Sequence, residues 1–239
     1  MAAVTGILFD KDGTLFDFHA TWSVWAEGLL RHLAGGDAGV AQSLADAIGF
    51  RLADPAAGVK AEFLPASVVI AGTPEVVAAA LLPLLPGQDA VALVDMMNAR
   101  AALAPQAPAV PLRPLLQGLR GRGLRLGLAT NDGEEPALAH LAAAGISDLF
   151  DFVAGYDSGH GAKPEPGQLL AFARAFGLDP GAVVMVGDST HDLIAGRRAG
   201  MRTLAVLTGL AGAHDLAPHA DAVLPDIGAI PDWLDQHGG

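Results

Sequence analysis

Short apolar runs that end in polar residues recur along this chain, and they constrain its fold more than any other feature. In chain order they occupy residues 6–9, 124–129, 183–186, 203–206 and 222–224. Segments with the spacing of amphipathic helices lie between them, at about 112–120, 135–144, 165–176 and 192–199. Short strands that alternate with helices of this length predict a doubly wound, Rossmann-like α/β fold, in which helices cover both faces of a parallel sheet.

The region between the first two runs has a different pattern. Its first helix carries an apolar stripe that includes Trp22 and Trp25, which we expect in the core of this region. Further helices are expected at about residues 40–48, 75–85 and 89–103, and the segment ends at Pro105, Pro108 and Pro111. We therefore predict an α/β core domain of residues 1–17 and 109–239, with an all-helical domain of residues 18–108 inserted after the first core strand.

The composition excludes several classes of function. The 239-residue chain carries a formal net charge of -12, so its average surface repels nucleic acids and anionic membranes. It contains no cysteine, which excludes disulfides, thiolate metal sites and a cysteine nucleophile. Residues 1–4 lack the pattern of a signal peptide, and Pro74, Glu75 and Pro83 interrupt the most apolar stretch, residues 68–85. We therefore expect a cytoplasmic protein.

Polar residues follow the three clearest strands, at the sheet edge where doubly wound folds bind ligands. The three pairs are Asp10 with Asp12, Thr130 with Asn131, and Asp188 with Asp192. A lysine in the loop before the third core helix, Lys163, supplies a cation to this acidic set. Each of these residues taken alone has an ordinary structural role in a turn, a helix cap or a solvated loop. Their order and their placement at one edge favour a common site.

At these positions the sequence resembles the haloacid dehalogenase (HAD) superfamily. Residues 10–17, Asp-Lys-Asp-Gly-Thr-Leu-Phe-Asp, are similar to its first motif, and residues 187–192, Gly-Asp-Ser-Thr-His-Asp, to its fourth. Thr130 resembles the second motif and Lys163 the third. The insert lies where this superfamily places its helical cap of the first type (C1), and the subgroup that the chain resembles most is the phosphoglycolate phosphatase-like one.

The resemblance implies a magnesium-dependent phosphatase that hydrolyses a small phosphate ester, phosphoglycolate or a related phosphomonoester, through an aspartyl-phosphate on Asp10. The side chains of Asp10 and Asp188 and the backbone carbonyl of Asp12 would bind Mg²⁺, which prefers oxygen ligands. Asp192 would lie behind these ligands and orient a water molecule. The expected partner is the small-molecule substrate, with no nucleic acid or membrane, and the expected state is a monomer or a homodimer.

The residue types also suit phosphoryl transfer, which needs an in-line nucleophile and neutralisation of charge on the equatorial oxygens. Asp10 would attack phosphorus and form the acyl-phosphate. Asp12 would act as general acid toward the leaving alkoxide and then as general base toward water. Thr130, the backbone amide of Asn131 and the Lys163 ammonium would hold the phosphoryl oxygens.

Two other functions stay open at this point. A phosphotransferase or phosphomutase of the same fold would keep Asp12. Mutases of the β-phosphoglucomutase type carry a histidine twelve residues after the nucleophile, however, where this chain has Trp22. A non-catalytic protein that binds phosphorylated metabolites would not need Asp12 at all. The phosphatase is therefore the favoured function.

Some positions depart from the motifs or carry none. Lys11 stands where the family often has an apolar residue; it either pairs with nearby carboxylates or is simply exposed, and we favour exposure. In the insert, the candidates to meet a polar or anionic leaving group are His19, Arg51 and Lys60, each of them a common surface residue type. The insert contains no distinctive motif that names the substrate.

Overall fold

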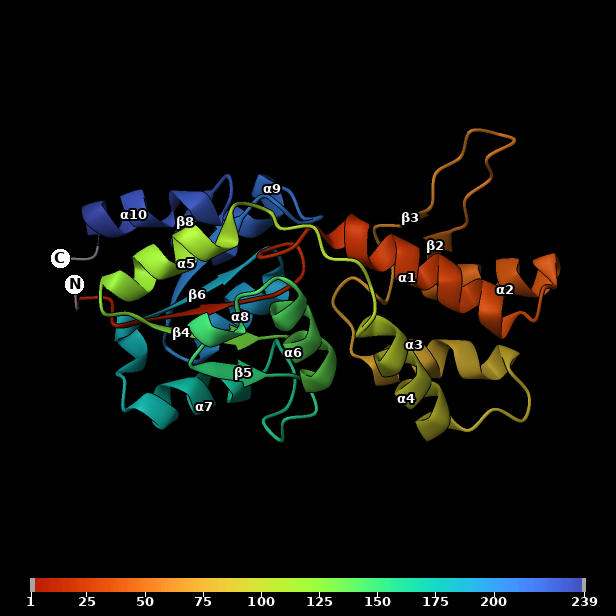
Figure 1. The fold of residues 1–239 in the computed structure, drawn as a ribbon, viewed down its shortest axis with the longest axis horizontal. Coiled ribbons are helices and arrows are strands. Elements are labelled where there is room, and N and C mark those ends of the chain that lie inside the picture. The colour runs from red at the N-terminus through yellow and green to blue at the C-terminus, as the bar shows by residue number, and fades with distance from the viewer. Residues whose placement is uncertain (1–2, 238–239) are drawn as a thin grey trace. The chain divides into compact units, whose positions relative to one another are not determined.

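The computed structural model describes residues 3–237, and the outermost residues of the expected core domain, 1–2 and 238–239, lie outside the described residues. Within the described part, the chain divides into two compact units (Figure 1). One unit is formed by residues 3–17 and 106–237, and the other by residues 18–105. The second unit is therefore an insertion into the first.

A parallel sheet forms the centre of the first unit, and in the described residues its six strands have the order β5-β4-β1-β6-β7-β8. The strands are β1 (Gly6–Phe9), β4 (Arg125–Ala129), β5 (Phe152–Ala154), β6 (Val183–Gly187), β7 (Arg202–Val206) and β8 (Ala222–Leu224). Five of them are the predicted strands, and the doubly wound α/β fold is confirmed. The three-residue strand β5 is not among the predicted strands.

The central strand β1 pairs in parallel with β4 on one side and with β6 on the other. Phe9, the last residue of β1, lies opposite Leu128 of β4 and Val186 of β6. The chain builds β4 and β5 on one side of β1 and then crosses to build β6, β7 and β8 on the other. Such a change of direction marks the place where doubly wound folds bind ligands, just beyond the carboxyl ends of the strands.

Helices cover both faces of this sheet. They are α5 (Leu112–Gly121), α6 (Glu134–Ala143), α7 (Gly167–Phe176), α8 (Thr190–Arg198), α9 (Ala213–Leu216) and α10 (Ile230–His237). Short 3₁₀ turns connect them at η2 (Ser147–Leu149), η3 (Pro180–Ala182), η4 (Ala217–His219) and η5 (Ile227–Ala229). The four predicted core helices are confirmed, and α9 and α10 are additions to the prediction.

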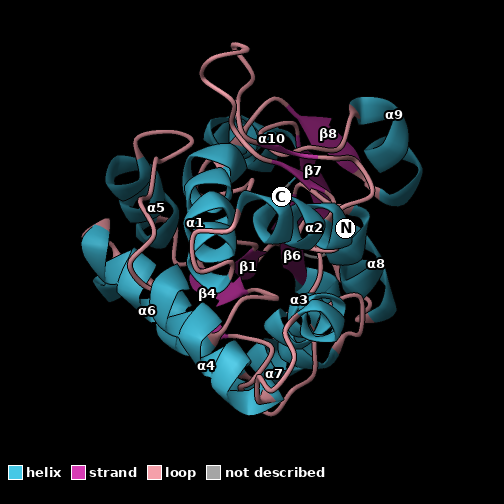
Figure 2. Cartoon of the chain, turned by 90° about the vertical axis from the view of Figure 1, so that its right-hand side faces the viewer, coloured by secondary structure: helices cyan, strands magenta, loops and turns pink. Residues whose placement is uncertain are grey.

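Alternate residues of the buried strands pack into two different apolar layers, as the period of two in a β-strand requires. Ile7 and Phe9 join a cluster with α5, α6 and α10, whereas Leu8 joins a cluster with α7 and α8. Figure 1 shows α5 and α10 on one side of the sheet and α7 on the other. Figure 2 shows α9 beside β8, and Leu193 of α8 and Leu216 of α9 form a small apolar cluster with Ala205 of β7. Both faces are thus buried, which explains why the strands read as continuous apolar runs.

The inserted unit has its own apolar core. Its helices are α1 (Phe18–Leu33), α2 (Ala38–Ile48), α3 (Pro74–Leu81), the 3₁₀ turn η1 (Leu82–Leu84) and α4 (Ala90–Ala101). The unit is helical as predicted, apart from a short antiparallel ribbon of β2 (Phe50–Arg51) and β3 (Glu62–Phe63). The sequence gives no sign of this ribbon, because two-residue strands are too short to show an alternating pattern.

Trp22 and Trp25 lie in the core of the inserted unit, as the helical stripe predicts. Their rings meet edge to face with centroids 5.1 Å apart, and the Trp25 indole Nε1 donates a hydrogen bond to the carbonyl oxygen of Met97 at 3.3 Å.

Side-chain caps fix the starts of two helices, because Asp37 accepts from backbone amides of α2 and Asp89 from one of α4. No helix within residues 3–237 combines the length and apolar character needed to cross a membrane.

Candidate active site

The polar residues predicted at three strand ends lie together at one edge of the sheet. Asp10 directly follows β1, Thr130 directly follows β4, and Asp188 directly follows β6. The parallel pairing of β1 with β4 and β6 sets these three positions side by side. The backbone amide of Asp10 donates to the carbonyl oxygen of Val186 at 2.8 Å, which extends the pairing with β6 by one residue and fixes the place where the aspartate leaves the sheet.

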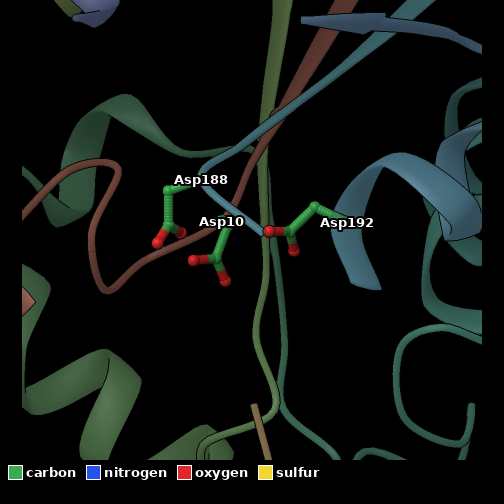
Figure 3. A group of neighbouring side chains, drawn as sticks. All are labelled: Asp10, Asp188 and Asp192. Carbon is green, nitrogen blue, oxygen red and sulfur yellow. The ribbon is translucent and has the colours of Figure 1, made fainter. Parts of the chain in front are cut away.

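A cluster of three buried carboxylates forms the centre of the site (Figure 3). Asp10, Asp188 and Asp192 each offer one oxygen, and these oxygens lie within 4.8 Å of one another. Figure 3 shows that the three side chains come from three separate segments, with Asp192 on α8. This cluster contains the two carboxylates predicted to bind a metal, together with the aspartate predicted to lie behind them.

Two glycines allow the backbone to approach the Asp188 carboxylate closely. Gly13 has a positive φ of 80°, and a Cβ atom at this position would lie 2.3 Å from Asp188 Oδ2. A Cβ atom at Gly209 would lie only 1.7 Å from the same oxygen. Real Cβ atoms cannot come so close, so a side chain at either position would displace the carboxylate. The sequence shows Gly13 in its motif, whereas Gly209 stands outside any motif.

Lys163 lies inside the carboxylate cluster. Its Nζ atom is 2.5 Å from Asp10 Oδ1 and 2.6 Å from Asp192 Oδ1, and its side chain is buried. The Asn131 side chain holds the backbone of this lysine from both sides: its Nδ2 donates to the Lys163 carbonyl oxygen, and its Oδ1 accepts from the Lys163 amide, each at 2.8 Å. Sequence reasoning missed this use of the Asn131 side chain and expected only its backbone amide in the site.

The crowding of negative charge shifts the pKa values of the cluster. Burial raises the pKa of Asp10 from 3.8 to about 7, with Asp192 and Asp12 adding to the rise and Lys163 opposing it. Burial likewise raises the pKa of Asp188 well above its usual range, and the charges of Asp10 and Asp192 raise it further. Burial lowers the pKa of Lys163, but the attraction of Asp10 and Asp192 outweighs this effect and raises it overall. The lysine therefore stays charged, while the carboxylates repel one another.

A divalent cation fits this arrangement. Three carboxylates and one ammonium leave two negative charges uncompensated in a buried place, which is the charge that one such ion would neutralise. All the donors are oxygens, the ligands that hard cations such as Mg²⁺ prefer. The cluster could thus hold a divalent metal ion, with Asp10 and Asp188 as the side chains best placed to do so.

Asp192 has a different set of contacts from the other two carboxylates. Its Oδ2 accepts from the backbone amide of Ser189 at 3.0 Å and from the Ser189 hydroxyl at 2.7 Å, and its Oδ1 accepts from Lys163. Ser189 and Asp192 form the capping box that begins α8. Both oxygens of Asp192 therefore already accept hydrogen bonds from the protein, an arrangement that suits a residue that supports its neighbours.

Thr130 is buried at the start of the loop after β4. Its Oγ1 accepts from the backbone amide of Asp132 at 3.0 Å, and its carbonyl oxygen accepts from Gln168 Nε2 at 3.0 Å. Gln168 is completely buried on α7 and was not a predicted site residue. Its position directly after the Lys163 loop is the only sequence signal that could have indicated it. These contacts tie the Thr130 loop to the helix that follows Lys163.

The expectation that Lys11 is exposed is wrong, because its side chain is fully buried. Its Nζ lies 2.9 Å from Asp12 Oδ2 and 3.2 Å from Asp12 Oδ1, so both oxygens of the Asp12 carboxylate face one ammonium. The same Nζ lies 3.0 Å from Asp132 Oδ2 and 2.8 Å from His140 Nδ1. Burial lowers the pKa of Lys11, but Asp12 and Asp132 raise it by more. The open alternative, pairing with nearby carboxylates, is the correct one.

Comparison with known proteins identifies the family at this point. The family described as haloacid dehalogenase-like hydrolase matches residues 4–200, which include all four motifs and the whole carboxylate cluster. The chain belongs to this family. The HAD resemblance seen in the motifs is therefore confirmed, and the phosphoglycolate phosphatase-like subgroup has support from individual relatives.

Curated HAD relatives match about half of the chain. A phosphoglycolate phosphatase of Rhodospirillum rubrum is 35% identical over 127 residues, which cover 52% of this chain and 53% of the relative. The pyrophosphatase PpaX of Bacillus pumilus is 32% identical over 104 residues, which cover 44% of this chain and 48% of the relative. The chain thus spans about half the length of the curated relatives it matches.

Solved HAD structures match the chain over nearly its whole length. A crystal structure described as a predicted phosphoglycolate phosphatase from Haemophilus somnus superposes with a TM-score of 0.73 at 19% identity and covers 98% of this chain and 99% of that one. At this identity the likeness shows the fold alone. It agrees with the parallel sheet and the inserted unit described above.

Proposed function

We propose that this HAD protein is a magnesium-dependent phosphatase that hydrolyses a small phosphomonoester, phosphoglycolate or a related metabolite, through an aspartyl-phosphate on Asp10. One observation carries the proposal: the two carboxylates of the first motif pair with two different buried lysines, Asp10 with Lys163 and Asp12 with Lys11. A mechanism with one carboxylate as nucleophile and another as proton carrier needs two carboxylates in separate surroundings. A protein that only binds phosphate needs no second carboxylate.

In the first step, an Asp10 oxygen attacks phosphorus while the bond to the leaving oxygen breaks. Thr130, the Asn131 amide and Lys163 surround the transferring group and stabilise charge on its equatorial oxygens. Asp12 delivers the proton that the leaving alkoxide takes up and is then a carboxylate. The products of the step are a free alcohol and a phosphoryl group bound covalently to Asp10.

In the second step, water hydrolyses the acyl-phosphate. Asp12, now a carboxylate, takes a proton from the attacking water, and the phosphorus–oxygen bond to Asp10 breaks to release inorganic phosphate. Asp10 and Asp188 would hold the Mg²⁺ ion, with the backbone carbonyl of Asp12 as a further ligand and Asp192 supporting them. When bound, the ion supplies positive charge that stabilises the negative phosphoryl oxygens.

We propose that the inserted unit is the C1 cap and the other unit the catalytic core, with the core at residues 1–17 and 109–239 as the sequence predicts. The matching relatives include a phosphoglycolate phosphatase and a pyrophosphatase, so the cap residues would select among phosphate esters. The expected cytoplasmic location and the monomeric or homodimeric state remain predictions. Assaying the purified protein against a panel of phosphorylated metabolites with Mg²⁺ tests the proposed activity, and no hydrolysis of any of them would contradict it.

A mutase is the alternative that has the most in common with this site. Trp22 argues against a mutase, because it stands at the position of the mutase histidine and packs edge to face on Trp25 in the core of the insert. A tryptophan offers no imidazole for proton exchange with a sugar phosphate. Addition of a sugar acceptor should therefore not speed the turnover of an aryl phosphate.

Removal of the metal should abolish activity and lower stability in a pH-dependent way. We expect EDTA to stop hydrolysis of an aryl phosphate and Ca²⁺ to replace Mg²⁺ poorly, because Ca²⁺ has looser coordination. Burial in the folded state raises the pKa of Asp10 from 3.8 to about 7, so between these pH values the metal-free folded protein binds more protons than the unfolded chain. Its stability therefore falls as the pH rises through this range. Mg²⁺ competes with those protons, so the increase in Tm that it causes should be larger at pH 8 than at pH 5.

The cap proposal predicts a change in substrate preference at Arg51. Its guanidinium pairs with Glu62 on the surface of the ribbon, so Arg51→Ala should not disturb the fold. We expect kcat/KM for anionic metabolites to fall by up to about fivefold, the range of an exposed charge contact, while nitrophenyl phosphate is unaffected. Arg31→Ala, which breaks an exposed pair with Glu27 in the same unit, is the matched control. An equal loss for all substrates would give the cap residue a purely structural role.

A further inference from the structure

A buried ammonium links the proposed acid–base carboxylate to the loop of residues 130–133 after β4, the proposed phosphate-binding loop. Lys11 Nζ contacts both oxygens of Asp12 on one side and Asp132 Oδ2 on the other. Asp132 is fixed in turn, because its Oδ1 accepts from the Gly133 amide at 2.9 Å and its own amide donates to Thr130 Oγ1 at 3.0 Å. The chain of contacts therefore runs from Asp12 through Lys11 to the loop that carries Thr130.

The same ammonium is also anchored to a helix. His140, which is buried on α6, places its Nδ1 2.8 Å from Lys11 Nζ. A protonated lysine can only donate, so Nδ1 accepts and the ring proton sits on Nε2. Contacts from the first motif, from the loop after β4 and from α6 thus converge on one nitrogen. This arrangement fixes the ammonium in space more firmly than a single ion pair would.

We propose that Lys11 is a positioning residue that holds the Asp12 carboxylate in the orientation needed for proton transfer and fixes it relative to the phosphate-binding loop. The proposal rests on the proposed function, since it assigns Asp12 the acid–base role. Asp12 is partly exposed, and without the ammonium its side chain would be free to rotate away from the reacting oxygen. The competing explanation is that Lys11 only compensates the charge of Asp12 and Asp132.

The test replaces Lys11 by methionine, which keeps the length of the side chain and removes the ammonium. We expect kcat for an alkyl phosphate to fall by about 10- to 100-fold, as for a misplaced catalytic group, with KM changed little. The loss in the rate of the first step should be smaller for nitrophenyl phosphate, whose leaving group needs little protonation, whereas hydrolysis of the acyl-phosphate is common to both substrates. In an Asp12→Asn background, Lys11→Met should cause little further loss, because residues that act as a unit are not additive.

A second variant separates positioning from charge compensation. Lys11→Met leaves two carboxylates without their shared cation, and this variant can lose stability for that reason alone. Lys11→Met/Asp132→Asn removes one negative charge together with the ammonium, so we expect its Tm to return toward that of the wild type. The rate with an alkyl phosphate should stay low in this double variant, since Asp12 still lacks its donor.

The outcomes divide clearly. Recovery of both Tm and alkyl-phosphate turnover in the double variant would overturn the positioning role and leave Lys11 as a counter-ion. Equal losses in the rate of the first step for alkyl and aryl substrates, or full additivity with Asp12→Asn, would overturn it as well. The single variant Asp12→Asn tests the proposed function separately from the role of Lys11. If this variant turns over normally, the proposed acid–base function of Asp12 fails, and the role of Lys11 fails with it.

Discussion

Replacing Asp10 by asparagine should reduce phosphate-ester hydrolysis by more than about 10⁴-fold, to the background of the uncatalysed reaction. The amide is a poor nucleophile, so no acyl-phosphate can form at this position. The variant also loses one of the two proposed side-chain ligands of the metal. Steady-state assays with aryl and alkyl phosphates, with Mg²⁺ present, measure this loss.

The stability of Asp10→Asn shows whether a loss of activity is due to unfolding. Burial raises the pKa of Asp10 to about 7, so a charged carboxylate at this place costs stability above that pH. An uncharged amide avoids this cost, and the metal-free variant should therefore be no less stable than the wild type at pH 8. Asp148→Asn, on an exposed aspartate paired with Arg113, is a matched substitution that should leave activity unchanged. Substantial turnover by Asp10→Asn would contradict the assignment of the nucleophile.

Replacing Asp12 by asparagine should have a different result. Magnesium affinity should persist, because the proposed contact of this residue with the ion is its backbone carbonyl. Loss of general acid–base assistance typically costs about 10²- to 10⁴-fold, and we expect turnover of an alkyl phosphate to fall by this amount. With nitrophenyl phosphate, the first step should suffer less than the second. Stopped-flow absorbance should therefore record a burst of nitrophenol followed by slow turnover.

The contrast between the two variants tests the division of roles. If Asp10→Asn and Asp12→Asn lose magnesium binding and activity to the same degree, the carboxylates do not have separate functions. Normal turnover by Asp12→Asn would show that another group transfers the proton. Binding of Mg²⁺ can be followed independently of activity by the Tm shift in each variant.

Much of the core could be predicted because of one physical constraint. A strand that helices cover on both faces must be apolar along its whole length, and β1 and β6 show this as continuous runs. The first polar residue after each run then marks the edge of the sheet, which is why Asp10, Thr130 and Asp188 could be assigned to one place. The two-residue strands β2 and β3 are too short to carry such a signal, whereas β5, which is no shorter than β8, is not among the predicted strands.

The contacts of the lysines could not be predicted in the same way. Lys163 lies 32 residues from Asn131, and Lys11 lies 129 residues from His140. Nothing local in the sequence distinguishes such a buried lysine from an exposed one, because its partners come from other elements. Lys11 follows a buried strand and precedes a turn, and both burial and exposure are compatible with that setting. Only the packing of α6 against the sheet decides between them.

Net charge gave a useful but incomplete expectation. The chain carries -12 overall, so a phosphate site needs local positive charge. The two buried lysines, each beside one carboxylate of the first motif, do not supply enough of it, because Asp132, Asp188 and Asp192 lie around them as well. A divalent cation bound by Asp10 and Asp188 would add positive charge. Together with the two lysines, that cation would allow the site to bind an anionic substrate despite the acidic average of the chain.

Chemical trapping of the acyl-phosphate tests the central claim most directly. Asp12→Asn would be mixed with nitrophenyl phosphate and Mg²⁺, quenched during the slow phase and treated with borohydride, which reduces an aspartyl-phosphate to homoserine. Peptide mass spectrometry would then locate the modified residue, with the same treatment lacking substrate as the control. We predict homoserine at position 10 and only in the sample with substrate. A burst of nitrophenol without modification at Asp10, or with modification at another residue, would contradict the account.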